Sequence, residues 1–450
     1  MTGKELILKT LRHEKTDRIP WIPFAGVHAG KLIGVNAKEI LTNEEKLLES
    51  LLEVNKLYRP DGQPVMFDLQ IEAEVLGCEL QWAEDAPPAV RTHPLAETKE
   101  LPCICQVPQK TDGRIPMVLD VMKKLKKKVG DTTALYGLTC GPFTLASHLR
   151  GTNIFMDMFE DPEYVKALIH YANEINIKMA EYYIEAGMDV IAVVDPLISQ
   201  ISPKHFKKFL TEPYTKLFDF IREKKAFSSF FVCGDATRSI DVMCQTNPDS
   251  ISIDENVDMV AAKEVSDKHN IAMGGNIPLT TVMLHGTQQD NMKYTLELMD
   301  NLSHKNLIIA PGCDMPYDVP VENTIAVQQT ISDPEKTRET IANYEVVEED
   351  IDIEIPDYGS LEKPLVEVFT LDSATCAACT YMMNSANDMK EHFGDKIDIV
   401  EYKWTIKENI ARVKKMGVKN LPSIYINGQL KYSSIIPSRD EFVKEIKAFM

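Results

Sequence analysis

The chain alternates short apolar, β-rich runs with helical patterns. Eight runs fit buried strands: residues 18–24, 64–68, 134–139, 189–195, 228–234, 250–254, 271–275 and 306–312. Most of the intervals between them carry a helical pattern, for example residues 161–187 and 202–225. Strands that alternate with helices pair in parallel. The pattern therefore predicts an α/β fold, a (β/α)8 TIM barrel, whose functional residues lie at the C-terminal ends of the strands.

A second pattern follows an acidic, proline-bearing stretch at residues 346–362, which is typical of a linker. We therefore expect a barrel domain at residues 1–345 and a small α/β domain at residues 363–450. The predicted element order of the small domain is β-α-β-α-β-β-α, with a hairpin turn at Asn427 and Gly428. Within the first domain, residues 79–115 fit a hairpin insertion.

Composition excludes some functional classes. The formal net charge of −19 argues against nonspecific binding to nucleic acid. No run is long and apolar enough to span a membrane, and residues 1–15 fit an amphipathic helix rather than a cleavable signal. We expect a cytoplasmic protein. Nine cysteines, an odd number, argue against a disulfide framework in such a protein.

Acidic, amide and sulfur side chains follow the predicted strands. In a barrel they share one mouth, and they are Asp68, Asp195, Cys233, Asp235, Asp254, Glu255, Asn276, Cys313 and Asp314. Cys233 and Cys313 follow the fifth and eighth strands, so they can meet across the mouth. Two thiolates with a carboxylate or imidazole make a zinc site, which is catalytic when a fourth position stays open. A thiol bound there would lose its proton and become a nucleophile. The alternative is plain packing, because single cysteines are often small core residues.

Several stretches resemble a known family: FDLQIEAEVLGCEL (67–80), CGPFTLASHLRGT (140–152), GGNIPLTTVMLHGT (274–287) and APGCDMPYDVPVEN (310–323). Residues 1 to about 345 resemble the uroporphyrinogen decarboxylase superfamily, in particular its methylcobamide:coenzyme M methyltransferase branch. The resemblance implies a barrel that moves a methyl group from a methylated corrinoid, carried by a partner protein, to a thiol or related acceptor. It also implies zinc, held by an H-x-C motif and a distal cysteine.

The sequence departs from that motif at one position. Cys233 and Cys313 match the two cysteines, but Phe231 stands where the resemblance implies the histidine. We expect Glu255 to supply the missing ligand, with Asp254, His28 or His148 as alternatives. The other alternative is that zinc binds weakly or not at all and the two cysteines act as thiols.

Other residues at the predicted mouth and in the loops near it have expected roles. We expect Asp195 to act in catalysis. The residues expected to contact the corrinoid are His28, Asp68, His148 and Asn276, although His148 also fits a core histidine. The decarboxylase branch grips acidic porphyrinogens with arginines, but FAGVHAGKLIG (24–34) has none, and we expect Arg18 to be structural. Porphyrinogen decarboxylation is therefore disfavoured.

The C-x-x-C motif of Cys376 and Cys379 follows a predicted strand and opens a helix. A helix N-terminus stabilises a thiolate at Cys376, and Cys379 lies one turn on as the resolving thiol. With Pro422 in the place of the cis-proline loop, residues 363–450 resemble a thioredoxin-like or glutaredoxin-like domain. Ala377 and Ala378 replace the Gly-Pro of the thioredoxin motif. The alternative is half of a zinc site.

Together these features predict a corrinoid-dependent methyltransferase with an attached dithiol redox domain. Its partners would be a corrinoid protein and a small thiol or other methyl acceptor. The CAAC pair would keep the thiols at the barrel mouth reduced or take part in thiol exchange. The alternative function is a barrel that binds a corrinoid or tetrapyrrole without methyl transfer, with the redox activity carried by the C-terminal domain.

Overall fold

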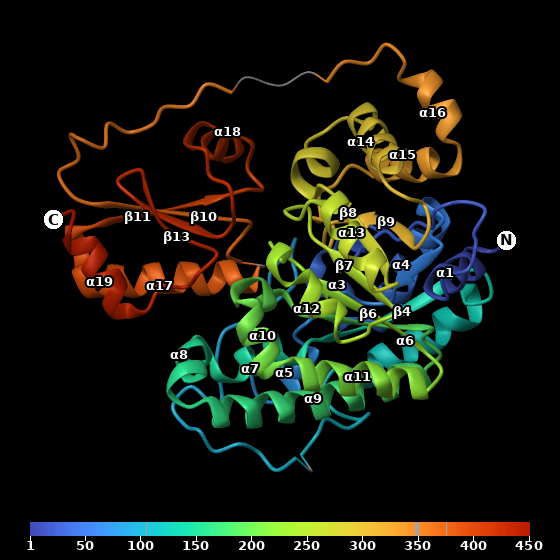
Figure 1. The fold of residues 1–450 in the computed structure, drawn as a ribbon, viewed down its shortest axis with the longest axis horizontal. Helices are drawn as coiled ribbons and strands as arrows, with labels where there is room; N and C mark the ends of the chain where they lie inside the picture. The colour runs from blue at the N-terminus through green and yellow to red at the C-terminus, as the bar shows by residue number, and fades with distance from the viewer. Residues whose placement is uncertain (105, 347–350, 375) are drawn as a thin grey trace. The chain divides into compact units, whose positions relative to one another are not determined.

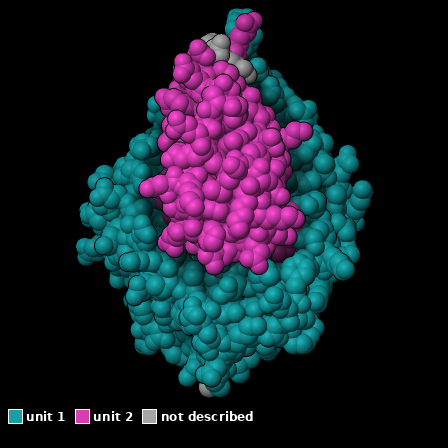
Figure 2. Space-filling model, turned by 90° about the vertical axis from the view of Figure 1, so that its left-hand side faces the viewer, with its two compact units in different colours: residues 1–198, 202–344 teal, residues 199–201, 345–450 magenta. Residues whose placement is uncertain are grey.

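The computed structural model describes residues 1–104, 106–346, 351–374 and 376–450. The chain divides into two compact units, coloured separately in Figure 2: unit 1 comprises residues 1–198 and 202–344, and unit 2 comprises residues 199–201 and 345–450. Part of the predicted linker, residues 347–350, lies outside the described residues.

Unit 1 is built on a curled sheet of seven parallel strands in the order β1-β4-β5-β6-β7-β8-β9. The strands are β1 (Gly62–Pro64), β4 (Ala134–Cys140), β5 (Val190–Val194), β6 (Phe227–Val232), β7 (Ser250–Ile253), β8 (Ala272–Ile277) and β9 (Leu307–Pro311). Every strand residue except Phe227 is buried, as expected for parallel strands covered on both faces. The unit is an α/β fold of TIM-barrel type.

Helices connect the strands and cover the outside of the sheet, as α9 does on β4 and β5, and α11 on β6 (Figure 1). The helices of unit 1 are α1 (Gly3–Leu11), α2 (His28–Lys31), α3 (Ala37–Thr42), α4 (Glu44–Tyr58), α5 (Ile71–Val75), α6 (Ile115–Val129), α7 (Pro142–Arg150), α8 (Asn153–Glu160), α9 (Pro162–Glu185), α10 (Pro203–Phe209), α11 (Thr211–Glu223), α12 (Ile240–Cys244), α13 (Met259–Lys268), α14 (Gln288–Asn301), α15 (Val321–Ser332) and α16 (Pro334–Thr340). Among the described residues, no helix combines the length and the apolar character that crossing a membrane requires.

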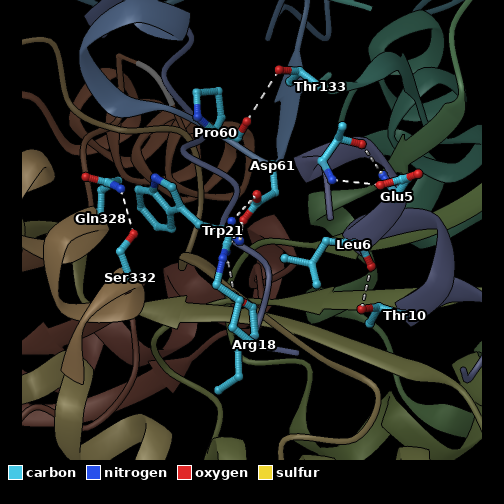
Figure 3. Close-up of polar contacts among 12 residues, drawn as sticks. Glu5, Leu6, Thr10, Arg18, Trp21, Pro60, Asp61, Thr133, Gln328 and Ser332 are labelled. Carbon is cyan, nitrogen blue, oxygen red and sulfur yellow. Dashed lines mark hydrogen bonds and ion pairs between the residues drawn. The ribbon is translucent and has the colours of Figure 1, made fainter. Parts of the chain in front are cut away.

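The segment around Trp21 joins the two edges of the sheet. Trp21 forms a parallel bridge with Ile309, and its carbonyl oxygen accepts from the backbone N–H of Asp61 at 2.9 Å. Arg18 holds the segment in place: both terminal guanidinium nitrogens donate to the Asp61 carboxylate at 2.6 Å (Figure 3). The structural role expected for Arg18 is therefore confirmed. The predicted strand at residues 18–24 is reduced to this bridge.

The second predicted strand is shifted along the chain. We expected it at residues 64–68, whereas β1 ends at Pro64. The backbone N–H of Val65 still donates to the carbonyl of Tyr136 at 3.0 Å, and the chain then leaves the sheet. Phe67 lies outside the strand but is still buried in the core, with its ring 5.9 Å from the ring of Phe231. This burial accounts for the apolar residue that suggested a strand. The predicted hairpin insertion begins with the short antiparallel pair β2 (Leu80–Gln81) and β3 (Ala89–Val90).

Unit 2 has the predicted element order. Its strands β10 (Leu365–Thr370), β11 (Asp398–Lys403), β12 (Ser423–Ile426) and β13 (Gln429–Ser433) form a sheet in the order β11-β10-β12-β13. Its helices are α17 (Ala377–Phe393), α18 (Lys407–Met416) and α19 (Arg439–Lys447). Strands β10 and β11 are parallel, and the other two pairings are antiparallel. Asn427 and Gly428 have positive φ angles, as the predicted hairpin turn requires, and the Leu421–Pro422 peptide bond is cis.

Candidate functional site

Cys233 and Cys313 meet at the barrel mouth. Each follows the C-terminal end of a strand, β6 and β9, which are separated in the sheet by β7 and β8. Their sulfurs are joined in a disulfide, their Cα atoms lie 6.0 Å apart, and both side chains are partly exposed. The cysteine count argued against a disulfide framework. It does not bear on a single bond between two cysteines that the fold brings together across the mouth.

Three phenylalanine rings lie beneath this pair and form what we call the aromatic floor: Phe24, Phe67 and Phe231. The ring of Phe231 lies 5.0 Å from that of Phe24 and 5.9 Å from that of Phe67. All three are buried, and both cysteines pack against the cluster that contains them. Sequence reasoning singled out Phe231 but missed the other two. The available signal was an aromatic residue near the end of each of the first two predicted strands.

Glu255, the expected third metal ligand, lies just beyond β7 and is half-buried. Its carboxylate accepts a hydrogen bond from the backbone N–H of Leu279, and burial raises its pKa to about 8. A Cβ at Gly312 would lie 2.7 Å from the backbone nitrogen of Glu255, so only glycine lets the loop of Cys313 pass this close.

The donor set at the mouth does not fit a catalytic zinc site. Such a site needs three protein ligands. Among the described residues, no group of three or more His, Cys, Asp or Glu side chains is placed to hold a metal ion. Phe231 fills the place of the implied histidine, and the two sulfurs are bonded to each other. We therefore derive no step through zinc.

Asp195, the expected catalytic acid, is fully buried behind β5. Its carboxylate accepts from the backbone N–H groups of Phe143 and Thr144, each at 2.9 Å, from the Thr144 hydroxyl at 2.5 Å, and from the hydroxyl of Tyr214. It therefore caps the N-terminus of α7 from a neighbouring strand. Burial raises the pKa of Asp195 to about 6 in spite of these donors. Its catalytic role stays a prediction.

Two of the residues expected to contact the corrinoid are histidines, and both are buried. The ring of His28 lies between the hydroxyl of Tyr58 at 2.6 Å and the carbonyl of Tyr317 at 3.0 Å, and burial lowers its pKa to about 4. Burial also lowers the pKa of His148, to about 3, and in the described part of the chain neither of its ring nitrogens has a hydrogen-bond partner.

The other two expected corrinoid contacts are also buried. Asp68 pairs with Arg114 at 2.5 Å, and Asn276 donates to the carbonyls of Asp254 and Val257 at 2.9 and 2.8 Å. The structure shows no contact between any two of the described residues His28, Asp68, His148 and Asn276. Their role in binding the corrinoid stays a prediction.

Glu72 is a further buried acid near the mouth. It is 0% exposed, and one carboxylate oxygen accepts from the Thr139 hydroxyl at 2.7 Å and from the Cys140 backbone N–H at 3.3 Å. The other oxygen has no partner among the described residues. Burial raises the pKa of Glu72 to about 7, so it binds a proton near neutral pH.

In unit 2, Cys376 is the N-cap of α17. Its sulfur accepts a hydrogen bond from the backbone N–H of Cys379 at 3.3 Å, and its side chain is partly exposed. Cys379 is 0% exposed, and its sulfur accepts from the N–H of Leu371 at 3.4 Å. Burial raises the pKa of Cys379 well above its ordinary value. The motif therefore presents one accessible sulfur at a helix N-terminus and one covered sulfur a turn further on.

The sequence of unit 1 is similar to those of known proteins. The profile of the uroporphyrinogen decarboxylase (URO-D) family matches residues 2–333. A methylcobamide:CoM methyltransferase MtbA from Methanosarcina acetivorans is 26% identical over 328 residues, covering 72% of this chain and 95% of that protein. A uroporphyrinogen decarboxylase from Wolbachia pipientis wMel is 27% identical over 300 residues, covering 65% of this chain and 85% of that protein.

A solved structure agrees with these sequence relatives. A methyltransferase from Methanosarcina mazei superposes with a TM-score of 0.67 at 25% identity, covering 74% of this chain and 98% of that one. The match of the family profile extends from α1 to the end of α15 and includes both cysteines of the mouth. The chain belongs to the uroporphyrinogen decarboxylase family.

Proposed function

We propose that unit 1 is a methyltransferase that moves a methyl group from a methylated corrinoid, carried by a partner protein, to a thiol or related acceptor at the barrel mouth. The observation that carries the proposal is the meeting of Cys233 and Cys313 at the ends of β6 and β9. Relatives named for methylcobamide:CoM methyl transfer, which align over about seven-tenths of the chain, support it.

The reaction is a nucleophilic displacement. The acceptor thiol would lose its proton to solvent and take the methyl group, and the corrinoid of the partner protein, as the methyl donor, would keep the electron pair of the broken bond. The aromatic floor excludes water beneath the acceptor and keeps that end of the mouth apolar. Reduced Cys233 and Cys313 would border the same place.

The buried polar residues serve this site as positioning groups. Asp195 fixes the start of α7 against β5, and Asn276 ties β8 to the loop after β7. Asp68 and His28 hold other parts of the rim through Arg114 and Tyr58. We propose that they keep the walls of the mouth rigid, so that a corrinoid and an acceptor meet in one geometry.

We further propose that unit 2 is a thioredoxin-like dithiol redox unit. Its element order and the placement of Cys376 at a helix N-terminus support this assignment. A second candidate function then follows from Phe231, which leaves the mouth without a third metal donor. In this candidate, unit 1 binds a corrinoid or tetrapyrrole without methyl transfer, and unit 2 carries the activity.

The test incubates the reduced full-length protein with methylcobalamin and a panel of thiols and tetrahydrofolate, while the absorption spectrum of cobalt is followed. We expect demethylation with at least one thiol, abolished by Cys233→Ala with Cys313→Ala and retained by Cys244→Ala, a buried cysteine elsewhere in the same unit. A spectrum that stays unchanged with every acceptor contradicts the methyltransferase.

A disulfide-reduction assay on the full chain separates the two candidates. If Cys376→Ser abolishes reduction of a protein disulfide while Cys233→Ser has no effect, and demethylation is also absent, the second candidate is supported. Demethylation that survives Cys376→Ser supports the first.

A further inference from the structure

We propose that the Cys233–Cys313 disulfide is a redox-active bond, that the Cys376 and Cys379 dithiol of this same protein species is its reductant, and that methyl transfer at the mouth requires the pair in its reduced form. The last of these statements rests on the methyl transfer proposed above. The first two do not.

The mouth disulfide is placed as a reactive bond rather than as a structural staple. The strands that carry it are already held to their ends by backbone pairing: Val232 pairs with Ile253 in β6 and β7, and Ile277 pairs with Pro311 in β8 and β9. The two cysteines therefore stay adjacent when the bond is broken. Both are partly exposed, so an attacking sulfur can approach them.

The buried cysteines of unit 1 are poor substitutes in this chemistry. Cys78, Cys140 and Cys244 are buried as thiols, at 4%, 0% and 2% exposure. Burial raises the pKa of Cys78 and Cys244 to about 12, so they remain protonated and unreactive at neutral pH. None of these three competes with the bonded pair, and Cys103, which is exposed, lies in the segment between β3 and α6 rather than at a strand end of the mouth.

The dithiol of unit 2 has complementary features. Cys376 is accessible, and its sulfur accepts a backbone N–H at the start of α17. Cys379 is covered and remains a thiol until its neighbour is consumed. This division suits Cys376 as the attacking sulfur and Cys379 as the resolving sulfur.

The exchange balances as a two-electron step. The Cys376 thiolate attacks one sulfur of the mouth pair, the mouth S–S bond breaks, and the released thiolate takes up a proton. Cys379 then loses its proton and attacks the Cys376 sulfur, which releases the second mouth cysteine as a thiol. The mouth pair gains two electrons and two protons, and Cys376 and Cys379 become a disulfide. An external dithiol or small thiol returns that disulfide to the reduced state.

The absence of a third metal donor gives this chemistry a reason. With Phe231 in the aromatic floor, the two sulfurs have no imidazole to complete a metal site, and nothing else among the described groups holds them as a ligated pair. Two thiols this close are readily converted to a disulfide by dioxygen or by exchange with another disulfide, which takes up the two electrons. A family member with this substitution therefore needs a reductant, and the chain carries one.

The test uses two full-length variants in the absence of other thiols. The acceptor is Cys376→Ser with Cys379→Ser, carrying the oxidised mouth pair. The donor is Cys233→Ser with Cys313→Ser, carrying the reduced CAAC pair. After mixing and acid quenching, alkylation and peptide mass spectrometry report each pair. We expect one mouth disulfide lost for each Cys376–Cys379 disulfide formed.

A trapping variant confirms the path. Cys379→Ser alone should accumulate a mixed disulfide between Cys376 and Cys233 or Cys313, and Cys376→Ser alone should accumulate none. If the donor leaves the mouth disulfide intact while dithiothreitol reduces it, and no mixed disulfide is trapped, the relay is overturned. If dithiothreitol also fails to reduce it, the bond is structural and the proposal is equally overturned.

Methyl transfer is then measured with the Cys376→Ser, Cys379→Ser variant, once with its mouth pair oxidised and once with it reduced. Activity in the reduced state alone supports the requirement for a reduced pair. Equal activity in both states overturns that part and leaves the methyltransferase standing. Exchange without methyl transfer in either state removes the proposed methyltransferase and leaves the relay as a redox activity of its own.

Discussion

The ring of Phe231, which stands two residues before Cys233 of the barrel mouth, lies 5.0 Å from the ring of Phe24. Residues two apart along a strand face the same side of the sheet, so the side chains of Phe231 and Cys233 are expected on the same side. An aromatic ring thus takes the place that a metal donor would need.

Phe231→His should restore metal binding. An imidazole beside two reduced thiols completes the three donors that zinc requires. We expect about one zinc per chain in the reduced variant, measured by inductively coupled plasma mass spectrometry, and much less in the reduced wild type. The double variant Phe231→His, Cys233→Ser should return to the wild-type level. Equal zinc in the wild type and the single variant would show that the histidine is not what is missing.

Arg18→Met should destabilise unit 1. The Asp61 carboxylate is 3% exposed, and losing both guanidinium donors leaves it with the backbone N–H of Trp21 at 2.8 Å. The expected loss is about 1–3 kcal/mol in the free energy of unfolding, because a largely buried charge is left short of partners.

A matched pair in the same unit provides the control. Arg338 contacts Asp300 with the same two-pronged geometry, at 2.6 and 2.7 Å, but both side chains are exposed. Arg338→Met should therefore change urea unfolding much less than Arg18→Met. Equal losses in the two variants would mean that burial does not set the strength of the Arg18 pair.

Glu72→Gln should flatten the pH dependence of stability. The folded pKa of Glu72 is raised to about 7, so this group favours the folded state at low pH and loses that contribution as pH rises toward 7 and above. The difference from the unfolded value of about 4.3 corresponds to about 4 kcal/mol. Gln keeps the acceptor for Thr139 and cannot ionise. Urea unfolding at pH 5 and pH 8 should show a smaller drop in the variant.

Glu181 offers a comparison of opposite sign. Hydrogen bonds from Lys178 and Lys224 lower its pKa to about 2, so its contribution is present above the unfolded value and is lost only in strong acid. Glu181→Gln should therefore leave the change in stability between pH 5 and pH 8 as it is in the wild type. A slope altered equally by both variants would remove Glu72 as its source.

Alkylation should distinguish the two cysteines of the CAAC motif. Cys376 is partly exposed, whereas Cys379 is 0% exposed. In the folded, reduced protein, iodoacetamide should modify Cys376 many times faster, as read from tryptic peptides over time. In urea the two rates should converge. Faster labelling of Cys379 in the folded state would exchange the roles assigned to the two thiols.

Much of the architecture could be predicted because strands and helices leave different periodicities in sequence. The C-terminal ends of β4 to β9 followed from that alternation, and so did the cysteines placed at them, whereas the first two predicted strands were a single bridge and a shifted strand. Phe67 shows where this prediction fails. An apolar run indicates that residues are buried, but it does not distinguish residues buried at the mouth from residues buried in a strand.

The site was less accessible to sequence reasoning. The contacts between Phe24, Phe67 and Phe231 join residues far apart along the chain. Asp195 was recognised as a strand-end acid, but its position alone did not reveal that its oxygens receive the donors of Phe143, Thr144 and Tyr214. Such partners depend on how neighbouring helices begin, which local patterns do not encode.

The close crossing of Gly312 over Glu255 has a wider meaning for the barrel mouth. A methyl group at residue 312 would collide with a backbone nitrogen 2.7 Å away, and the loop would have to bow outward and carry its sulfur with it. The reactivity of this protein thus depends on the absence of a side chain at residue 312. Any larger residue there would displace the loop that carries Cys313 and separate the two sulfurs, while the strands kept their positions.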